Sequence, residues 1–305
     1  MSRLLLGAVT ALFLAGGLIS PLSLATAEEI ALDGLSLSEA EAQYEFNQTR
    51  TCQPSGINSC HPGEQPQPVQ WGQPVVEYRI NDSGTGVLNS GSPEVTDELK
   101  HAVFESFDAW NDQECSDFEM IYGGTTAVAQ PGYDPDSQTV NILLWQDDDW
   151  PHPLYDAVAL TTVTYRPCNG EILSADIEFN TADYIYTNHE GAAGTQIDLR
   201  NTLTHEIGHF LGLDHSPNSH ATMFATAPHG EISKRDLHRA DIAGLCFIYP
   251  AGEEYDLPPC GGADGSNGAG SSRRCSTTAD NPSPWIIFLA MSLIGILLFQ
   301  HRRRQ

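Results

Sequence analysis

One eleven-residue segment, from His205 to His215, constrains the fold of this chain more than any other feature. Its informative letters are His205, Glu206, His209, Gly212 and His215. Residues four apart share one face of a helix, so a helix here would aim both of its imidazoles in the same direction. Glycine tolerates the left-handed backbone that ends a helix. Gly212 therefore predicts a sharp turn that brings His215 back toward the other two histidines.

This pattern is typical of a catalytic zinc site. Three protein nitrogens leave one coordination position of the metal open for water, whereas structural zinc sites use four protein ligands. Glu206 is adjacent to His205, where its carboxylate can hydrogen-bond that water. We therefore predict that His205, His209 and His215 bind zinc and that Glu206 is the catalytic base. The alternative is three unrelated histidines, which would require all five letters to coincide by chance.

The charge of the chain argues against nucleic acid as a partner. Its 305 residues include 40 acidic and 14 basic side chains, a formal net charge of -26. Such a surface repels the phosphate backbone, so nucleic acid is a poor candidate partner. The substrates expected with the zinc motif are proteins or peptides, and the chain is expected to be a monomer. The many carboxylates make calcium a candidate ion, although solubility outside the cell explains them equally well.

The order of the apolar segments predicts an α+β domain with one mostly shared sheet, which we expect to be mixed and twisted. It also predicts a helix that carries the zinc motif, and a C-terminal helix. A modest helix is also expected near the N-terminus, over residues 35–46. The segments that read as strands cover residues 75–80, 118–122, 139–145, 158–165 and 176–180. Those that read as the main helices cover residues 94–111, 197–211 and 234–248.

Both ends of the chain have the composition of sorting segments. Residues 4–19 are apolar and Ala25-Thr26-Ala27 suits signal peptidase, so residues 1–27 are expected to be a signal peptide that directs export. Residues 28–70 are expected to be an N-terminal extension or short prosegment. Residues 251–275 are expected to be a Gly/Ser-rich linker that carries a sorting motif, and residues 276–305 a hydrophobic tail with an Arg cluster.

The hydrophobic run of this tail, residues 285–299, would reach roughly 22 Å as a helix, short of a hydrocarbon core of about 30 Å. Together with Cys275 and the Arg cluster, it resembles the C-terminal sorting signals of myxobacteria and related bacteria. That resemblance implies entry into the membrane, processing near Cys275 and attachment to the cell surface. An ordinary tail anchor is the alternative.

The other six cysteines are expected to form disulfides, because an exported chain meets an oxidising compartment. Cys52 and Cys60 are close enough in sequence for a small loop. The remaining four could form two more bridges, and their pairing stays open: Cys115, Cys168, Cys246 and Cys260.

The full pattern HExxHxxGxxH resembles that of the metzincin zinc metallopeptidases. Ser216 after the last histidine, and Met223 eight residues past it, are similar to the matrixin branch in particular. No Tyr stands two residues beyond Met223, which argues against an astacin-like branch. The resemblance covers residues 71–250. It implies a metzincin-like zinc-peptidase domain that hydrolyses peptide bonds, with Met223 as a packing floor beneath the metal.

Some positions depart from the matrixin pattern. Glu178 replaces a histidine that would bind a second, structural zinc, which argues against that zinc. Asp241 alone remains of the acidic pair usual in the last helix, and the inhibitory Cys-containing prosegment is absent, since Cys60-His61-Pro62-Gly63 is only a weak echo of it. A noncatalytic, metal-stabilised binding module on the same fold is the competing hypothesis. The candidate calcium ligands are Asp176, Asn180, Asp183 and Asp147 to Asp149.

Overall fold

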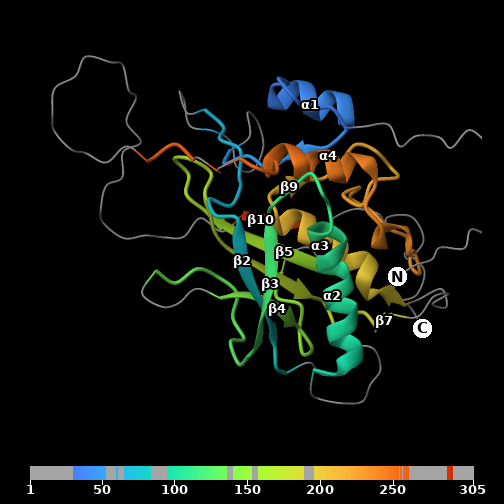
Figure 1. Cartoon of the computed structure of the whole chain (residues 1–305). Helices are drawn as coiled ribbons and strands as arrows, with labels where there is room; N and C mark the ends of the chain where they lie inside the picture. Colours follow the sequence, from blue (N-terminus) through green and yellow to red (C-terminus); the bar gives the residue numbers. More distant parts are fainter. Residues whose placement is uncertain are drawn as a thin grey trace, which may run out of the picture. The chain divides into compact units, whose positions relative to one another are not determined.

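The computed structural model describes residues 30–52, 60, 65–83, 95–135, 140–152, 157–188, 196–253, 255, 257–260 and 287–290. A six-stranded mixed sheet with the strand order β10-β5-β6-β4-β2-β3 lies at its centre (Figure 1). β2 pairs in parallel with β3 and β4, β4 pairs in parallel with β6, and β5 is antiparallel to β6. The predicted α+β fold with a mixed sheet is confirmed. The strands span Val75–Asn81 (β2), Glu119–Thr126 (β3), Asn141–Trp145 (β4), Ala159–Tyr165 (β5) and Ile172–Phe179 (β6).

Helices α2 (Asp97–Asn111) and α3 (Leu199–Phe210) pack against each other, and α3 also packs on β5 and β6. Thr96 caps α2, its side chain accepting a hydrogen bond from the Leu99 N–H. The predicted apolar stripe of α2 is buried, and the indole of Trp110 at its end donates a hydrogen bond to the Thr204 carbonyl in α3 at 2.9 Å. The sheet and α2 together hold α3 in the interior.

The C-terminal helix is shorter than the sequence suggests. It was expected over residues 234–248, but α4 spans Arg239–Ile248. His238 is its N-cap, and the Asp241 carboxylate accepts a hydrogen bond from the His238 N–H, which fixes the start of the helix. Residues Ser233–Arg235 form a separate 3-10 turn, η2, which packs on α3.

Part of the segment predicted as an extension packs against the domain. Helix α1 (Leu37–Tyr44) contacts α4, and strand β1 (Asn47–Gln48) pairs antiparallel with β9 (Leu213–Asp214), which directly follows the zinc-motif helix. The Thr49 N–H also donates to the Gly212 carbonyl at 2.8 Å. We call residues 37–51 the N-terminal arm. A further short parallel pair joins β7 (Tyr186–Thr187) to β8 (Ile197–Asp198).

Three disulfides connect six cysteines, as predicted. Cys52 is bonded to Cys60, and the pairing that the sequence left open is Cys115 with Cys246 and Cys168 with Cys260. The Cys115–Cys246 bond joins the end of the α2 region to α4, 131 residues further along the chain. Long covalent loops of this kind restrict the unfolded state strongly in the chain-entropy model.

Most of the predicted sorting segments lie outside the described residues. Within the tail the structure describes only Ile287–Ala290, as strand β10, which pairs antiparallel with β5. The prediction of a helix over residues 285–299 is therefore wrong at these four positions. Their backbone groups pair with strand β5 and not with one another. None of the helices in the described ranges combines the length and apolarity needed to span a bilayer.

The turn after α3 yields a test of why glycine is needed there. Gly212 has φ of 97°, and a Cβ at this position would lie 2.3 Å from the Val69 carbonyl oxygen. Gly124 has φ of 100° with nothing within 4 Å of its Cβ position, so it is a matched control for backbone strain alone. We expect Gly124→Ala to lose about 1 kcal/mol of unfolding free energy and Gly212→Ala about 2–5 kcal/mol, measured by urea denaturation. Equal losses would contradict the proposed steric role of Gly212.

Candidate metal centre

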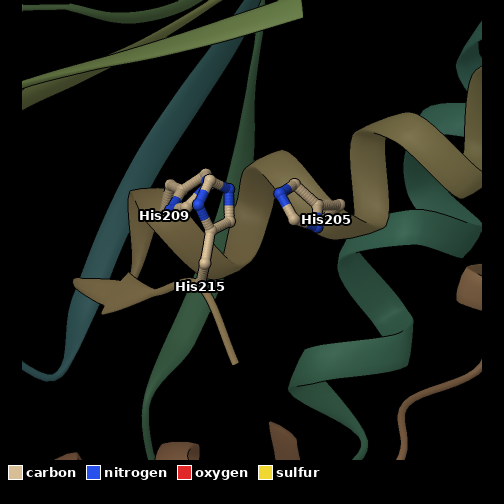
Figure 2. Close-up of side chains that lie close together, drawn as sticks. All are labelled: His205, His209 and His215. Carbon is tan, nitrogen blue, oxygen red and sulfur yellow. The ribbon is translucent and has the colours of Figure 1, made fainter. Parts of the chain in front are cut away.

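Helix α3 places two of the three histidines. The side chain of Asp198 accepts a hydrogen bond from the Asn201 N–H at 2.8 Å and so caps the helix. His205 and His209 are four residues apart on α3, and both are fully buried. The helix ends where the Gly212 N–H donates to the His209 carbonyl, and the chain then turns so that His215 follows from β9 (Figure 2). The predicted helix-turn arrangement is present.

The three imidazoles converge on one space. One nitrogen from each ring lies within 4.8 Å of the others, and this is the one His/Cys/Asp/Glu cluster with metal-binding geometry among the described residues (Figure 2). The Nε2 atoms of His209 and His215 are 3.3 Å apart. Two nitrogens bound tetrahedrally to zinc at about 2.0–2.1 Å would be roughly 3.3–3.4 Å apart. The spacing of this pair and the chemistry of the three imidazoles therefore fit a zinc ion.

Hydrogen bonds at the opposite ring nitrogens fix which atom faces the metal. Nδ1 of His205 lies 2.6 Å from the Thr222 carbonyl oxygen, and Nδ1 of His209 lies 2.9 Å from that of Leu213. A carbonyl can only accept, so each Nδ1 carries the proton and each Nε2 keeps a free lone pair. Burial lowers the pKa of His209 to about 4 and that of His215 to about 3, and it also lowers the pKa of His205 well below its usual value. All three rings are therefore neutral at pH 7, the form that binds metals.

Glu206 follows His205 on α3, and one of its carboxylate oxygens has no hydrogen-bond partner. The Thr161 hydroxyl donates to Oε2 at 2.6 Å, while Oε1 is buried without a hydrogen-bond partner, as is Nε2 of His205. Buried polar atoms without partners are rare, and both are explained by a bound metal and its water. Burial raises the pKa of Glu206 to about 7, a rise that the Thr161 hydrogen bond and the charge of Lys234 oppose. A carboxylate with this pKa suits proton transfer near neutral pH.

Met223 lies directly beneath α3. A Cβ at Gly208 would be 2.1 Å from the Met223 sulfur, so the missing side chain at Gly208 is what lets the methionine reach the helix. The segment that carries Met223 is held by Asp241 of α4, whose carboxylate accepts hydrogen bonds from the N–H groups of Thr222 at 2.7 Å and Met223 at 2.9 Å. Sequence reasoning assigned no site role to Asp241, although an acidic residue in the first turn of an otherwise apolar helix was a signal for one.

The N-terminal arm also contacts the third histidine. The Asn47 side chain donates to the His215 carbonyl at 2.7 Å, and the Asn218 side chain donates to the Glu45 carboxylate at 2.9 Å. The Ser216 hydroxyl donates to the Glu45 carbonyl. No motif in the sequence signals these contacts, because they join residues about 170 positions apart.

Glu178, which replaces a histidine that would bind a second zinc, and the candidate calcium ligand Asp176 are both engaged by the protein. Glu178 is buried, with Oε1 accepting from Gln146 at 2.6 Å and Oε2 lying 3.1 Å from Nε2 of His152. The carboxylate of Asp176 accepts hydrogen bonds from the N–H groups of Gly132 and Ile142. These contacts use the oxygens that a second zinc or a calcium ion would need, and neither ion has a cluster of three such ligands among the described residues.

Comparisons with known proteins agree with this geometry. The family model described as Matrixin matches residues 70–250. Metalloendoproteinase 2-MMP of Arabidopsis thaliana is 24% identical over 210 residues, which cover 67% of this chain and 52% of the relative. Karilysin of Tannerella forsythia is 25% identical over 183 residues, covering 60% and 34%. Neutrophil collagenase of Homo sapiens is 24% identical over 182 residues, covering 59% and 33%.

The chain thus spans between a third and about half the length of these relatives. The region that the family model matches holds the three histidines, Glu206 and Met223, and it makes up more than half of the chain. On this evidence, the chain belongs to the matrixin family.

Proposed function

We propose that this protein is a zinc-dependent endopeptidase in which His205, His209 and His215 hold the metal and Glu206 is the general base. The observation that carries the proposal is the cluster of three imidazoles, next in sequence to Glu206, whose carboxylate oxygen Oε1 is buried without a hydrogen-bond partner. A purely structural metal site would have a fourth protein ligand in place of that oxygen. The competing module without catalysis has no use for a base at this position.

In this mechanism a bound zinc ion supplies Lewis acidity, which acidifies water and polarises the scissile carbonyl. Glu206 supplies the proton transfers. Its Oε1 accepts a proton from the attacking water and later delivers it to the leaving amine. Met223 supports α3 from below without contacting the substrate, and the neutral tautomers fixed at His205 and His209 keep their lone pairs directed at the metal.

Thr161 orients the base. Its hydroxyl lies 2.6 Å from Oε2 and 3.1 Å from the backbone oxygen of Glu206, and it is fully buried in β5. With Oε2 engaged, the carboxylate cannot rotate freely, and Oε1 remains without a protein partner and free to accept a proton from the attacking water. Thr161 is therefore a positioning residue, which acts on the reaction through Glu206.

We further propose that the protein acts outside the cytoplasm. Three disulfides persist in oxidising compartments and are rare in reducing ones. This agrees with the signal peptide predicted over residues 1–27. Attachment through the C-terminal tail stays a prediction, to be tested by locating the protein before and after deletion of residues 276–305.

Glu206→Gln tests the proposed base. The amide cannot accept the proton, so we expect peptide cleavage to fall by roughly 10²-fold or more while the zinc content stays at one per chain. The measurements are kcat/KM on a peptide library and atomic absorption. Near-normal cleavage by this variant would rule out Glu206 as the base.

Thr161→Val and Thr161→Ser form a matched pair for the positioning role. Valine removes the hydroxyl at similar volume, so kcat should fall by about 10-fold or more with a smaller change in KM, and serine should restore most of the loss. Both variants should bind zinc normally. If serine and valine were equally impaired, packing and not the hydrogen bond would be the function of Thr161.

Removal of zinc should abolish cleavage and lower the melting temperature, because the metal binds the folded state alone. Titration of zinc into the chelated protein should restore both at one equivalent. Restoration only at two equivalents would indicate a second zinc ion. That result would contradict the role assigned to Glu178, whose oxygens are used in hydrogen bonds within the protein. Cleavage that survives complete chelation would exclude the zinc mechanism.

A further inference from the structure

Lys234 is a buried cation beside the metal centre that the mechanism does not use. It is one of two lysines in the chain and is 3% exposed. Its backbone N–H donates to the Asn201 side chain in α3 at 2.8 Å. The next residue, Arg235, forms a buried ion pair with Asp198 at the start of α3, with Nε 2.9 Å from Oδ1. Both contacts fix η2 against the helix that carries His205 and His209.

The ammonium group of Lys234 lies against the methionine-containing turn. It donates to the carbonyl of Phe224, the residue that follows Met223. Its positive charge acts on Glu206 and on all three histidines, lowering the pKa of each. An ammonium has three N–H donors, and this one has a single hydrogen-bond acceptor among the described residues.

The two buried cations of η2 differ in how they are compensated. Arg235 has the carboxylate of Asp198, whereas no described carboxylate lies within ion-pair distance of the Lys234 ammonium. The negative charges of Glu231, Glu206 and Asp241 raise its pKa from beyond ion-pair distance. Burial lowers the pKa of Lys234 to about 8, so the side chain remains mostly charged at pH 7. A buried charge without a close partner is costly, which indicates that a ligand completes its environment.

We propose that Lys234 makes the enzyme favour substrates with an aspartate or glutamate side chain next to the scissile bond. This inference rests on the proposed function. In the proposed mechanism the scissile carbonyl lies at the metal centre, and the carbonyl that accepts from Lys234 belongs to Phe224, which follows the methionine packed beneath that centre. A side chain next to the scissile bond is therefore the part of the substrate that we expect to approach Lys234. A carboxylate at this position can accept charge-assisted hydrogen bonds from the remaining N–H groups of Lys234. The repulsion expected from a chain of net charge -26 is screened beyond about 8 Å at physiological ionic strength.

A simpler role is that Lys234 only balances the charge of Glu206. The two roles predict different results. Loss of a general counter-charge would slow the cleavage of all peptides by the same factor, whereas loss of a substrate contact would slow the cleavage of acidic peptides selectively.

The test compares zinc-loaded wild-type protein with three variants on peptide pairs. Each pair differs only by Asp against Asn, or Glu against Gln, on one side of the cleaved bond. Lys234→Met removes the charge at similar length, Lys234→Arg keeps it, and Lys100→Met removes the other lysine, which is partly exposed on α2. We expect wild type to favour the acidic peptide on one side of the bond by about 10-fold or more in kcat/KM. This preference should survive in Lys100→Met and Lys234→Arg. In Lys234→Met, the ratio of kcat/KM for the acidic peptide to kcat/KM for the amide peptide should fall toward one.

A wild-type ratio near one, or a preference retained in Lys234→Met, would overturn the inference. Zinc content and circular dichroism establish that each variant is folded, and the wild-type ratio remains decisive if Lys234→Met is not. Absence of cleavage of every peptide by zinc-loaded wild type would instead reject the proposed function itself. Cleavage without charge preference would leave the proposed function intact.

Discussion

The proposed metal centre depends on hydrogen bonds from the Nδ1 atoms of His205 and His209 to backbone carbonyls. These bonds set the tautomer and the orientation of each ring, so the Nε2 lone pairs are aimed before any ion binds. The carbonyl that orients His205 belongs to Thr222, and the Thr222 N–H is held by Asp241. Helix α4 therefore influences the orientation of His205 through Thr222, a residue of the methionine-containing turn. Displacement of α4 would alter zinc binding without contacting the metal.

The third histidine of the cluster is held differently. His215 lies beyond the helix, where the chain makes a left-handed turn at Gly212 directly against the Val69 backbone. Strand β1 then pairs with β9, and Asn47 holds the His215 carbonyl. A loop with these contacts loses little entropy when it binds metal, because it is already ordered. The N-terminal arm thus contributes to the centre although it precedes the rest of the domain in the sequence.

The site and most of the sheet were predictable because their signals are local. The spacing of His205, His209 and His215 predicts one helical face and a turn, and alternation of apolar residues predicts strand β2 correctly. What failed depends on distant partners. The start of α4 was placed too early, because Lys234 and Arg235 bind α3 instead of continuing a helix. The roles of Thr161 and Asp241 were missed, since a threonine in a strand looks the same in sequence whether or not its hydroxyl faces a buried carboxylate.

X-ray absorption spectroscopy at the zinc edge of the metal-loaded protein tests the central claim most directly. The account predicts three imidazole nitrogens at about 2.0–2.1 Å and a single light ligand that exchanges when an inhibitor with a zinc-binding group is added. A fourth protein ligand, or fewer than three imidazoles in the coordination shell, would contradict it.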